Sequence, residues 1–261
     1  MCNPIPWDEK IVKDVQIAAV HALLIGVERD ANIDIGADRQ VIVKTCEFAR
    51  RIADEQNHPI VVICHLSSSP TWLRKFGLYE SAVFFMKDLA NAYQQLEFAI
   101  ENVPMMLNPT KTLNIEFRPI NFTSTVEFVN DVNHPRVGTC LDTCHAMMDI
   151  NTVGALSSYL PMSSDEFGGS TQINMASFFQ ANQKTIKWMH LANAKGHGFN
   201  DNHGLPFTKS ENDVETLSCI LRLYDKYQYH CPISIEVREL DYSNAINFAE
   251  TFVNIKQLLK N

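Results

Sequence analysis

The sequence has no apolar run long enough to cross a bilayer, and its first residues, Met1–Pro4, do not have the composition of a secretory signal. It also has no excess of basic residues, because 22 Lys and Arg stand against 30 Asp and Glu, a net charge of −8. These absences argue against a membrane protein and against a broad electrostatic DNA-binding surface, although they leave open a local, metal-bearing groove. No internal repeat, low-complexity tract or linker is present, so we expect a single domain over residues 1–261.

The seven cysteines are odd in number and scattered, which argues against a disulfide framework. Several lie in or beside apolar runs, as reduced core thiols do, namely Cys64, Cys140, Cys144 and Cys231. We therefore expect a reducing compartment and a cytoplasmic protein.

Short apolar runs alternate with longer helical segments, which predicts parallel β-α-β units. The clearest strand is expected at Pro59–Cys64, another at Val137–Leu141, and Asp38 is expected to cap a helix that runs to about Asn57. A length of 261 residues is usual for an α/β barrel, and 46% hydrophobic residues provide a large core. The sequence therefore predicts a (β/α)8 TIM barrel, with a doubly wound open sheet as the alternative.

Histidines and acids follow the expected strands at their carboxyl ends, which is where the loops of a barrel converge on one pocket. The set contains five imidazoles and four carboxylates: His21, His65, Glu101, Asp142, His145, His190, Asp201, His203 and Glu236. Any one of them is also explained as a satisfied polar residue at the end of a strand. Four carboxylates in one pocket would repel each other, and divalent cations would remove that repulsion. Mixed imidazole and carboxylate ligands suit Zn²⁺, with Mn²⁺ or Fe²⁺ as alternatives.

Other polar residues near these positions have less specific interpretations. Cys140 and Cys144 have metal-ligand spacing, but a strand-end turn that contains Asp142 does not suit a thiolate site, and we interpret both as buried thiols. Lys195 and Arg238 lie beside expected ligands and are candidates for binding an anionic substrate. Surface lysines and arginines are common, so the same two residues are also explained as ordinary solvated charges.

The run Val137-Gly-Thr-Cys-Leu-Asp-Thr-Cys-His-Ala146 resembles the signature of the endonuclease IV family (AP endonuclease family 2), part of the xylose isomerase-like TIM-barrel superfamily. The similarity extends to Trp188–Lys195, to Asp201–His203 and to the strand ending at Glu236. The resemblance implies three zinc ions held by nine ligands. It implies His21, His65 and Glu101 at the first ion; Glu101, Asp142, His190 and Glu236 at the second, with Glu101 bridging; and His145, Asp201 and His203 at the third.

The sequence also departs from this family pattern. The aromatic residue that the family places shortly after its first histidine is replaced by Leu23, Leu24 or Ile25, and Asn202 stands where the family has arginine. Glu101–Pro104 and Ile235–Arg238 look more like the sugar phosphate isomerase/epimerase branch of the superfamily. The first recognisable strand corresponds to the family's second, so the first strand and its helix are expected to be missing from the N-terminus. Met1–Trp7 or a partner subunit could then cover the open edge.

Two enzymatic functions follow from this resemblance. The first is a metal-dependent hydrolase that cleaves the phosphodiester at abasic sites in duplex DNA through a trinuclear centre. The second is a metal-dependent sugar or sugar phosphate isomerase or epimerase, in which Glu101 and Glu236 transfer a proton between adjacent carbons. A barrel that binds a metal without catalysis is a third, less favoured interpretation.

Overall fold

The structure is a computed structural model, and the chain forms two compact units. It describes residues 15–24, 29–104, 122–156, 173–196, 203–239, 241 and 243–260. The first unit contains residues 1–101 and 127–138, and the second contains residues 102–126 and 139–261. The division leaves β-α alternation in both units, as the sequence predicts.

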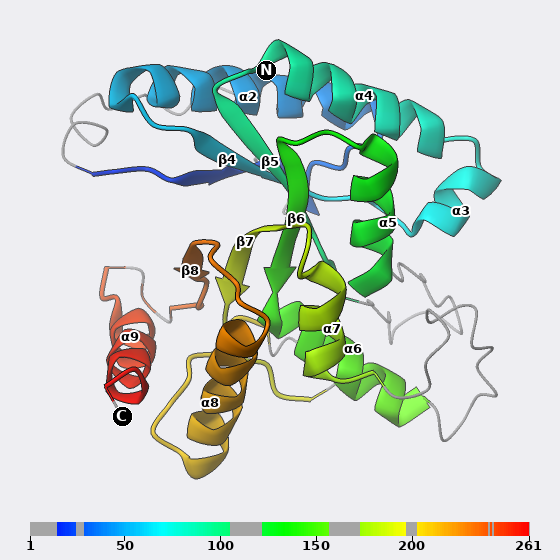
Figure 1. Ribbon diagram of the computed structural model, residues 1–261. Helices are drawn as coiled ribbons and strands as arrows, with labels where there is room; N and C mark the ends of the chain where they lie inside the picture. Colours follow the sequence, from blue (N-terminus) through cyan, green and yellow to red (C-terminus); the bar gives the residue numbers. More distant parts are fainter. Residues whose placement is uncertain are drawn as a thin grey trace. The chain divides into compact units, whose positions relative to one another are not determined.

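In the described residues of the first unit, three parallel strands are hydrogen-bonded in the order β1-β4-β5. The elements are β1 (Ala19–His21), β2 (Leu23–Leu24), β3 (Arg29–Asp30), α2 (Gly36–Gln56), β4 (Ile60–Cys64), α3 (Pro70–Lys75), α4 (Tyr79–Ala92) and β5 (Leu96–Glu101). Helix α2 packs along all three strands, and α4 packs on β5 (Figure 1). Strands β2 and β3 form a short antiparallel pair between β1 and α2.

Local sequence explains most of these elements. All five residues of β4 are buried, as expected for a central parallel strand covered on both faces. Helix α3 begins after Ser69, whose hydroxyl accepts a hydrogen bond from the Trp72 N–H, and Pro70 occupies its first turn. The prediction that Asp38 caps α2 is wrong, because the helix begins earlier, at Gly36. The Asp38 carboxylate lies in the first turn and instead accepts a hydrogen bond from the backbone N–H of Asn32.

In the second unit, three further strands are parallel and ordered β6-β7-β8. The remaining elements of the chain are α5 (Phe122–Val132), β6 (Val137–Asp142), α6 (Thr143–Leu156), α7 (Met175–Asn182), β7 (Ile186–Leu191), α8 (Glu211–Lys226), β8 (Ile233–Ile235) and α9 (Ile246–Leu258). The chain passes from one unit to the other after Glu101, within α5 and within β6. Helices α6 to α9 pack in a row, each against the next, and α9 also contacts β8 (Figure 1).

The core of the second unit explains which way its polar strand residues point. Met189 and Leu191 are buried in one hydrophobic cluster with the aromatic residues Phe178 and Phe179 of α7. Neighbouring residues of a strand point to opposite faces of the sheet. His190, between Met189 and Leu191, therefore points away from the helices and toward the other face of β7.

Some expectations concern residues that lie outside the described part of the chain. These are Met1–Trp7, a candidate cover for an open edge, and Asp201, a predicted metal ligand. No helix among the described residues is both long and apolar enough to span a membrane. The single domain over residues 1–261 stays a prediction.

Candidate metal-binding site

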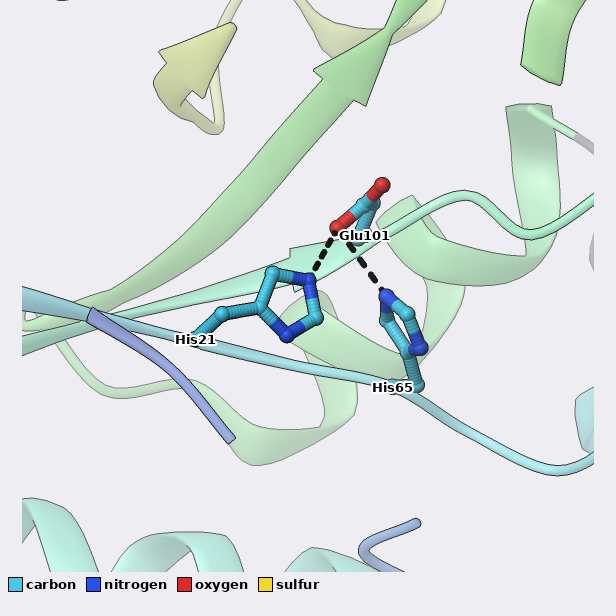
Figure 2. A group of neighbouring side chains, drawn as sticks. All are labelled: His21, His65 and Glu101. Atoms are coloured by element: carbon cyan, nitrogen blue, oxygen red, sulfur yellow. Dashed lines mark hydrogen bonds and ion pairs between the residues drawn. The ribbon is translucent and has the colours of Figure 1, made fainter. Parts of the chain in front are cut away.

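The first unit brings two imidazoles onto one carboxylate oxygen. The Nε2 atoms of His21 and His65 each lie 3.0 Å from Oε2 of Glu101. Figure 2 shows both rings pointing at this oxygen, and the rings meet edge to face with centroids 4.8 Å apart. The carboxyl group is almost completely buried, with a side chain only 2% exposed. This arrangement gives three donor atoms within reach of a single cation.

Strand register alone accounts for this first group. His21 lies opposite Ile63 in the pairing of β1 with β4, two residues before His65. Cys64 lies opposite Ile100 in the pairing of β4 with β5. His65 is the residue after Cys64 and Glu101 is the residue after Ile100, so the two also lie side by side. Because the strands are parallel, the three side chains reach the same carboxyl-end edge.

A second group of donors forms in the second unit, at the ends of β6, β7 and β8. Asp142 lies directly opposite His190 in the register, and the Glu236 N–H donates to the Leu191 carbonyl oxygen at 3.1 Å. The His190 Nδ1 atom is 2.6 Å from Oε2 of Glu236 and 3.8 Å from Oδ2 of Asp142. Two carboxylates therefore face one ring nitrogen, as in a site that takes a cation.

Asp142 has two roles at the start of α6. Its Oδ1 atom accepts a hydrogen bond of 2.8 Å from the backbone N–H of His145, so it caps the helix that begins at Thr143. The other oxygen, Oδ2, faces His190. The spacing of three residues between Asp142 and His145 is that of a helix cap and its third helical residue, which brings the imidazole beside the carboxylate.

His145 and His203 form a third group of donors with Asp142. Their Nε2 atoms are 2.8 Å apart, and the three side chains offer donor atoms close enough to share an ion. The Nδ1 atom of His145 is 2.7 Å from the backbone carbonyl oxygen of Asn102, which can only accept a hydrogen bond. Nδ1 therefore carries a proton, so Nε2, which contacts His203, is the nitrogen with which a neutral His145 ring would ligate a metal ion.

The chemistry of these donors fits a zinc ion. Two ligands at about 2.0–2.1 Å from a tetrahedral zinc ion lie about 3.3 Å apart. The observed donor separations of 3.0 Å in the first group and 2.8 Å between His145 and His203 are slightly shorter. A shift of a few tenths of an ångström in each side chain would therefore admit the ion.

Gly204 holds the turn that carries His203. Its backbone φ is +69°, a left-handed conformation that favours glycine. The Gly204 N–H donates to the Cys144 Sγ atom at 3.3 Å, and the Gly204 carbonyl oxygen accepts from the Arg238 N–H at 2.7 Å. A Cβ atom at this position would lie 3.1 Å from Cγ of Arg238. The turn is thus fixed between α6 and the segment after β8.

The two predicted substrate-binding residues lie in different surroundings. The Lys195 side chain is 59% exposed, and its Nζ atom is 3.5 Å from Oδ1 of the buried Asp213. Arg238 is exposed and its backbone fixes Gly204, which itself belongs to the turn beside His203. Arg238 therefore lies next to the third group, whereas Lys195 has a carboxylate partner of its own. Substrate binding by either residue stays a prediction.

Comparison with known families identifies the fold. Residues 11–252 match the family described as the xylose isomerase-like TIM barrel. The chain belongs to this family. The predicted TIM-barrel fold is therefore confirmed, and six of its parallel strands lie among the described residues. As a member of this enzyme family with clustered imidazole and carboxylate donors, the protein is a metal-dependent TIM-barrel enzyme.

Solved structures of other proteins have the same fold at low sequence identity. A D-tagatose 3-epimerase-like protein is 18% identical, with a TM-score of 0.59 over 96% of this chain and 80% of that protein. An L-ribulose 3-epimerase is 13% identical, with a TM-score of 0.57 over 100% and 82% of the two chains. Endonuclease IV from Thermus thermophilus is 15% identical, with a TM-score of 0.57 over 98% and 85%. No curated protein sequence matches the chain.

Two residues beside the donors were missed by the sequence analysis. Asn102 hydrogen-bonds the backbone of Asp142, and Thr143 anchors the first turn of α6 to the end of β7 through the Ala192 carbonyl oxygen. The only sequence signal for Asn102 is its position directly after Glu101. For Thr143, the signal was an acid at a strand end followed by a helix-forming run, which is the pattern of a capped helix.

Proposed function

We propose that the protein is a phosphodiesterase of the endonuclease IV type, which cleaves DNA at abasic sites with up to three zinc ions. The observation that carries the proposal is the third donor group, Asp142, His145 and His203, in which the Nε2 atoms of the two histidines lie 2.8 Å apart. One metal suffices for sugar isomerisation, so a third set of donors favours phosphodiester chemistry.

The proposed ligands follow the assignment that the family resemblance implies. In the first unit, His21, His65 and Glu101 would hold one ion, consistent with their contacts of 3.0 Å. In the second unit, Asp142, His190 and Glu236 would hold a second ion, and His145 and His203 a third, to which the resemblance adds Asp201. A bridging role for Glu101 is part of the same proposal and rests on the resemblance alone.

The ions, when bound, would supply Lewis-acid stabilisation of charge on the phosphate and on the leaving 3′ oxygen. The residues of this chain would keep the donors oriented. The Asn102 carbonyl oxygen holds the His145 tautomer, and the cap on α6 leaves only Oδ2 of Asp142 directed at His190. The Glu236 side chain is 44% exposed, against 2% for Glu101, so Glu236 would form the open side of the site.

Sugar isomerisation or epimerisation is the second candidate function, and the exposure of Glu236 is the observation that favours it. A carboxylate that transfers a proton must reach the substrate, and the Glu236 side chain is 44% exposed. In this function Glu101 and Glu236 would move the proton between adjacent carbons. Two structures of the same fold carry epimerase names, and the net charge of −8 suits a small sugar better than DNA.

Counting metals and assaying abasic DNA would separate the two functions. We expect three zinc ions per chain in the parent protein and two in His145→Ala. Nicking should fall by more than about 100-fold, since even a residue behind a ligand contributes about 10–100-fold. His230→Ala is the matched control, because His230 is an exposed histidine of the same unit, ahead of β8. One ion per chain, no nicking, and ketose proton exchange that survives His145→Ala would replace the first proposal by the second.

Cellular context remains part of the proposal. Abasic duplex DNA would be the substrate of the first function, and a small sugar or sugar phosphate that of the second. The cytoplasmic location, the choice of zinc over manganese or iron, and an oligomeric state stay predictions from the sequence.

A further inference from the structure

Asn102 forms a two-point hydrogen bond with the backbone of a proposed ligand. Its Nδ2 atom donates to the Asp142 carbonyl oxygen at 3.1 Å, and its Oδ1 atom accepts from the Asp142 N–H at 2.8 Å. The residue is only 1% exposed. Because one amide satisfies both backbone groups of Asp142, the side chain fixes the chain where β6 ends and α6 begins.

The backbone of Asn102 contacts a second proposed ligand. Its carbonyl oxygen is 2.7 Å from Nδ1 of His145, in a contact that holds the proton on that nitrogen. His145 itself donates its backbone N–H to the Asp142 carboxylate. Asn102, Asp142 and His145 therefore form a closed set of hydrogen bonds, in which Asn102 sets the position of one ligand and the tautomer of the other.

We propose that Asn102 is a positioning residue for the third donor group, acting on a bound metal ion only through Asp142 and His145. The inference rests on the proposed function in taking these side chains as ligands. It adds to that function the residue that holds Asp142 and His145 in position before a metal binds. An outer partner of this kind typically contributes about 10–100-fold to metal affinity.

A second buried asparagine, Asn182, serves to distinguish a positioning role of Asn102 from a general contribution to stability. Asn182, also 1% exposed, donates its side-chain amide to the Phe178 carbonyl oxygen inside its own helix, α7. It precedes the start of β7, whereas the donors lie at the strand ends. Asn182→Ala therefore removes a buried amide of the same kind and serves as the matched control for Asn102→Ala.

The test compares Asn102→Ala, Asn182→Ala and the parent chain by zinc titration, urea unfolding and ¹⁵N NMR of the histidine rings in the metal-free protein. We expect both variants to unfold at a lower urea concentration than the parent. Only Asn102→Ala should weaken binding of the ion at the third group, by about 10–100-fold. Only Asn102→Ala should also shift the His145 ring signals, assigned by their loss in His145→Ala, because the Asp142 backbone that places the ring against the residue-102 carbonyl oxygen is no longer held.

Asn102→Asp provides a second variant if Asn102→Ala does not fold. It keeps an acceptor for the Asp142 N–H and loses the donor to the Asp142 carbonyl oxygen, so a smaller change in the His145 signals is expected. Parent-like zinc affinity together with unchanged His145 signals would overturn the proposal. A parent chain that binds one ion would instead count against the trinuclear function, while the His145 signals would still test the role of Asn102.

Discussion

The donor groups of the two units are built in different ways. In the first unit, His21, His65 and Glu101 come from the ends of three strands that are direct neighbours, and their contacts follow from register alone. In the second unit, Asp142 also caps a helix, and His203 comes from a turn whose glycine contacts Cys144 and Arg238.

This difference indicates where each group is sensitive to mutation. Parallel strands fix the positions of side chains at their ends through many backbone hydrogen bonds, so single changes elsewhere should affect the first group little. A donor on a turn or at a helix cap depends on a few specific contacts. We therefore expect the second unit to lose its geometry through substitutions of residues that are not themselves donors.

Asp142 is expected to give the largest effect, because it serves as both cap and donor. Asp142→Ala should abolish activity and zinc binding in the second unit, while zinc binding by His21, His65 and Glu101 persists. Loss of the cap should also lower the free energy of unfolding by about 0.5–2 kcal/mol. Metal analysis together with urea unfolding of the full chain measures both effects.

Two further variants separate the roles of Asp142. Asparagine caps helices as well as aspartate, so Asp142→Asn should lose zinc binding with little loss from the cap. Ser210→Ala removes the equivalent cap of α8 and should lower stability while leaving zinc binding intact. If Asp142→Asn abolishes zinc binding in both units, the donor groups of the two units are not independent and the comparison between them fails.

Gly204→Ala is expected to give an intermediate effect. A left-handed backbone costs a non-glycine residue roughly 1–2 kcal/mol, and the new Cβ would press on Arg238. The turn should shift His203 away from His145 and weaken zinc binding there, measured by titration. Gly77→Ala is the control, because Gly77 has the same φ of +69° with nothing within 4 Å of an added Cβ. Equal zinc affinities in the two variants would contradict the proposed role of the turn.

Asp213→Asn is expected to give the smallest effect, on the pH dependence of stability. Burial alone would raise the pKa of Asp213, but hydrogen bonds from Thr208 and Asn193 and the Lys195 ammonium outweigh it and lower the pKa below 3.8. A lowered pKa in the folded state stabilises the fold above the unfolded value and loses that contribution as the pH falls. The variant should be less stable than the parent by about 1–3 kcal/mol at pH 7.

The gap between Asp213→Asn and the parent should narrow below about pH 4, where the parent carboxylate takes up its proton. Urea unfolding at pH 7 and at pH 3–4 measures the gap. A constant difference at every pH would mean that the carboxylate charge contributes nothing, and that Lys195 remains available for substrate.

Sequence pattern predicted the fold class and the strand ends at which the donors lie. Buried runs such as Ile60–Cys64 carry their own signal, because apolar β-branched residues between polar segments form central strands. The sequence pattern did not predict the start of α6, because this helix begins directly at the end of β6 without a loop. Asp142 was therefore interpreted as a strand end and not as a helix cap. The pattern also failed at Asp38, since the helix starts two residues earlier.

The sequence by itself therefore determined which imidazoles and carboxylates are candidate ligands and at which ends of the strands they lie, because burial and alternation are local properties of the chain. Only the tertiary structure decided which atoms meet. Hydrogen bonds between residues far apart in sequence select the His145 tautomer, fix the backbone of Asp142 through Asn102, and hold the turn at Gly204. A neutral amide or a glycine has no pattern of its own, so its role is set by what the folded chain brings next to it.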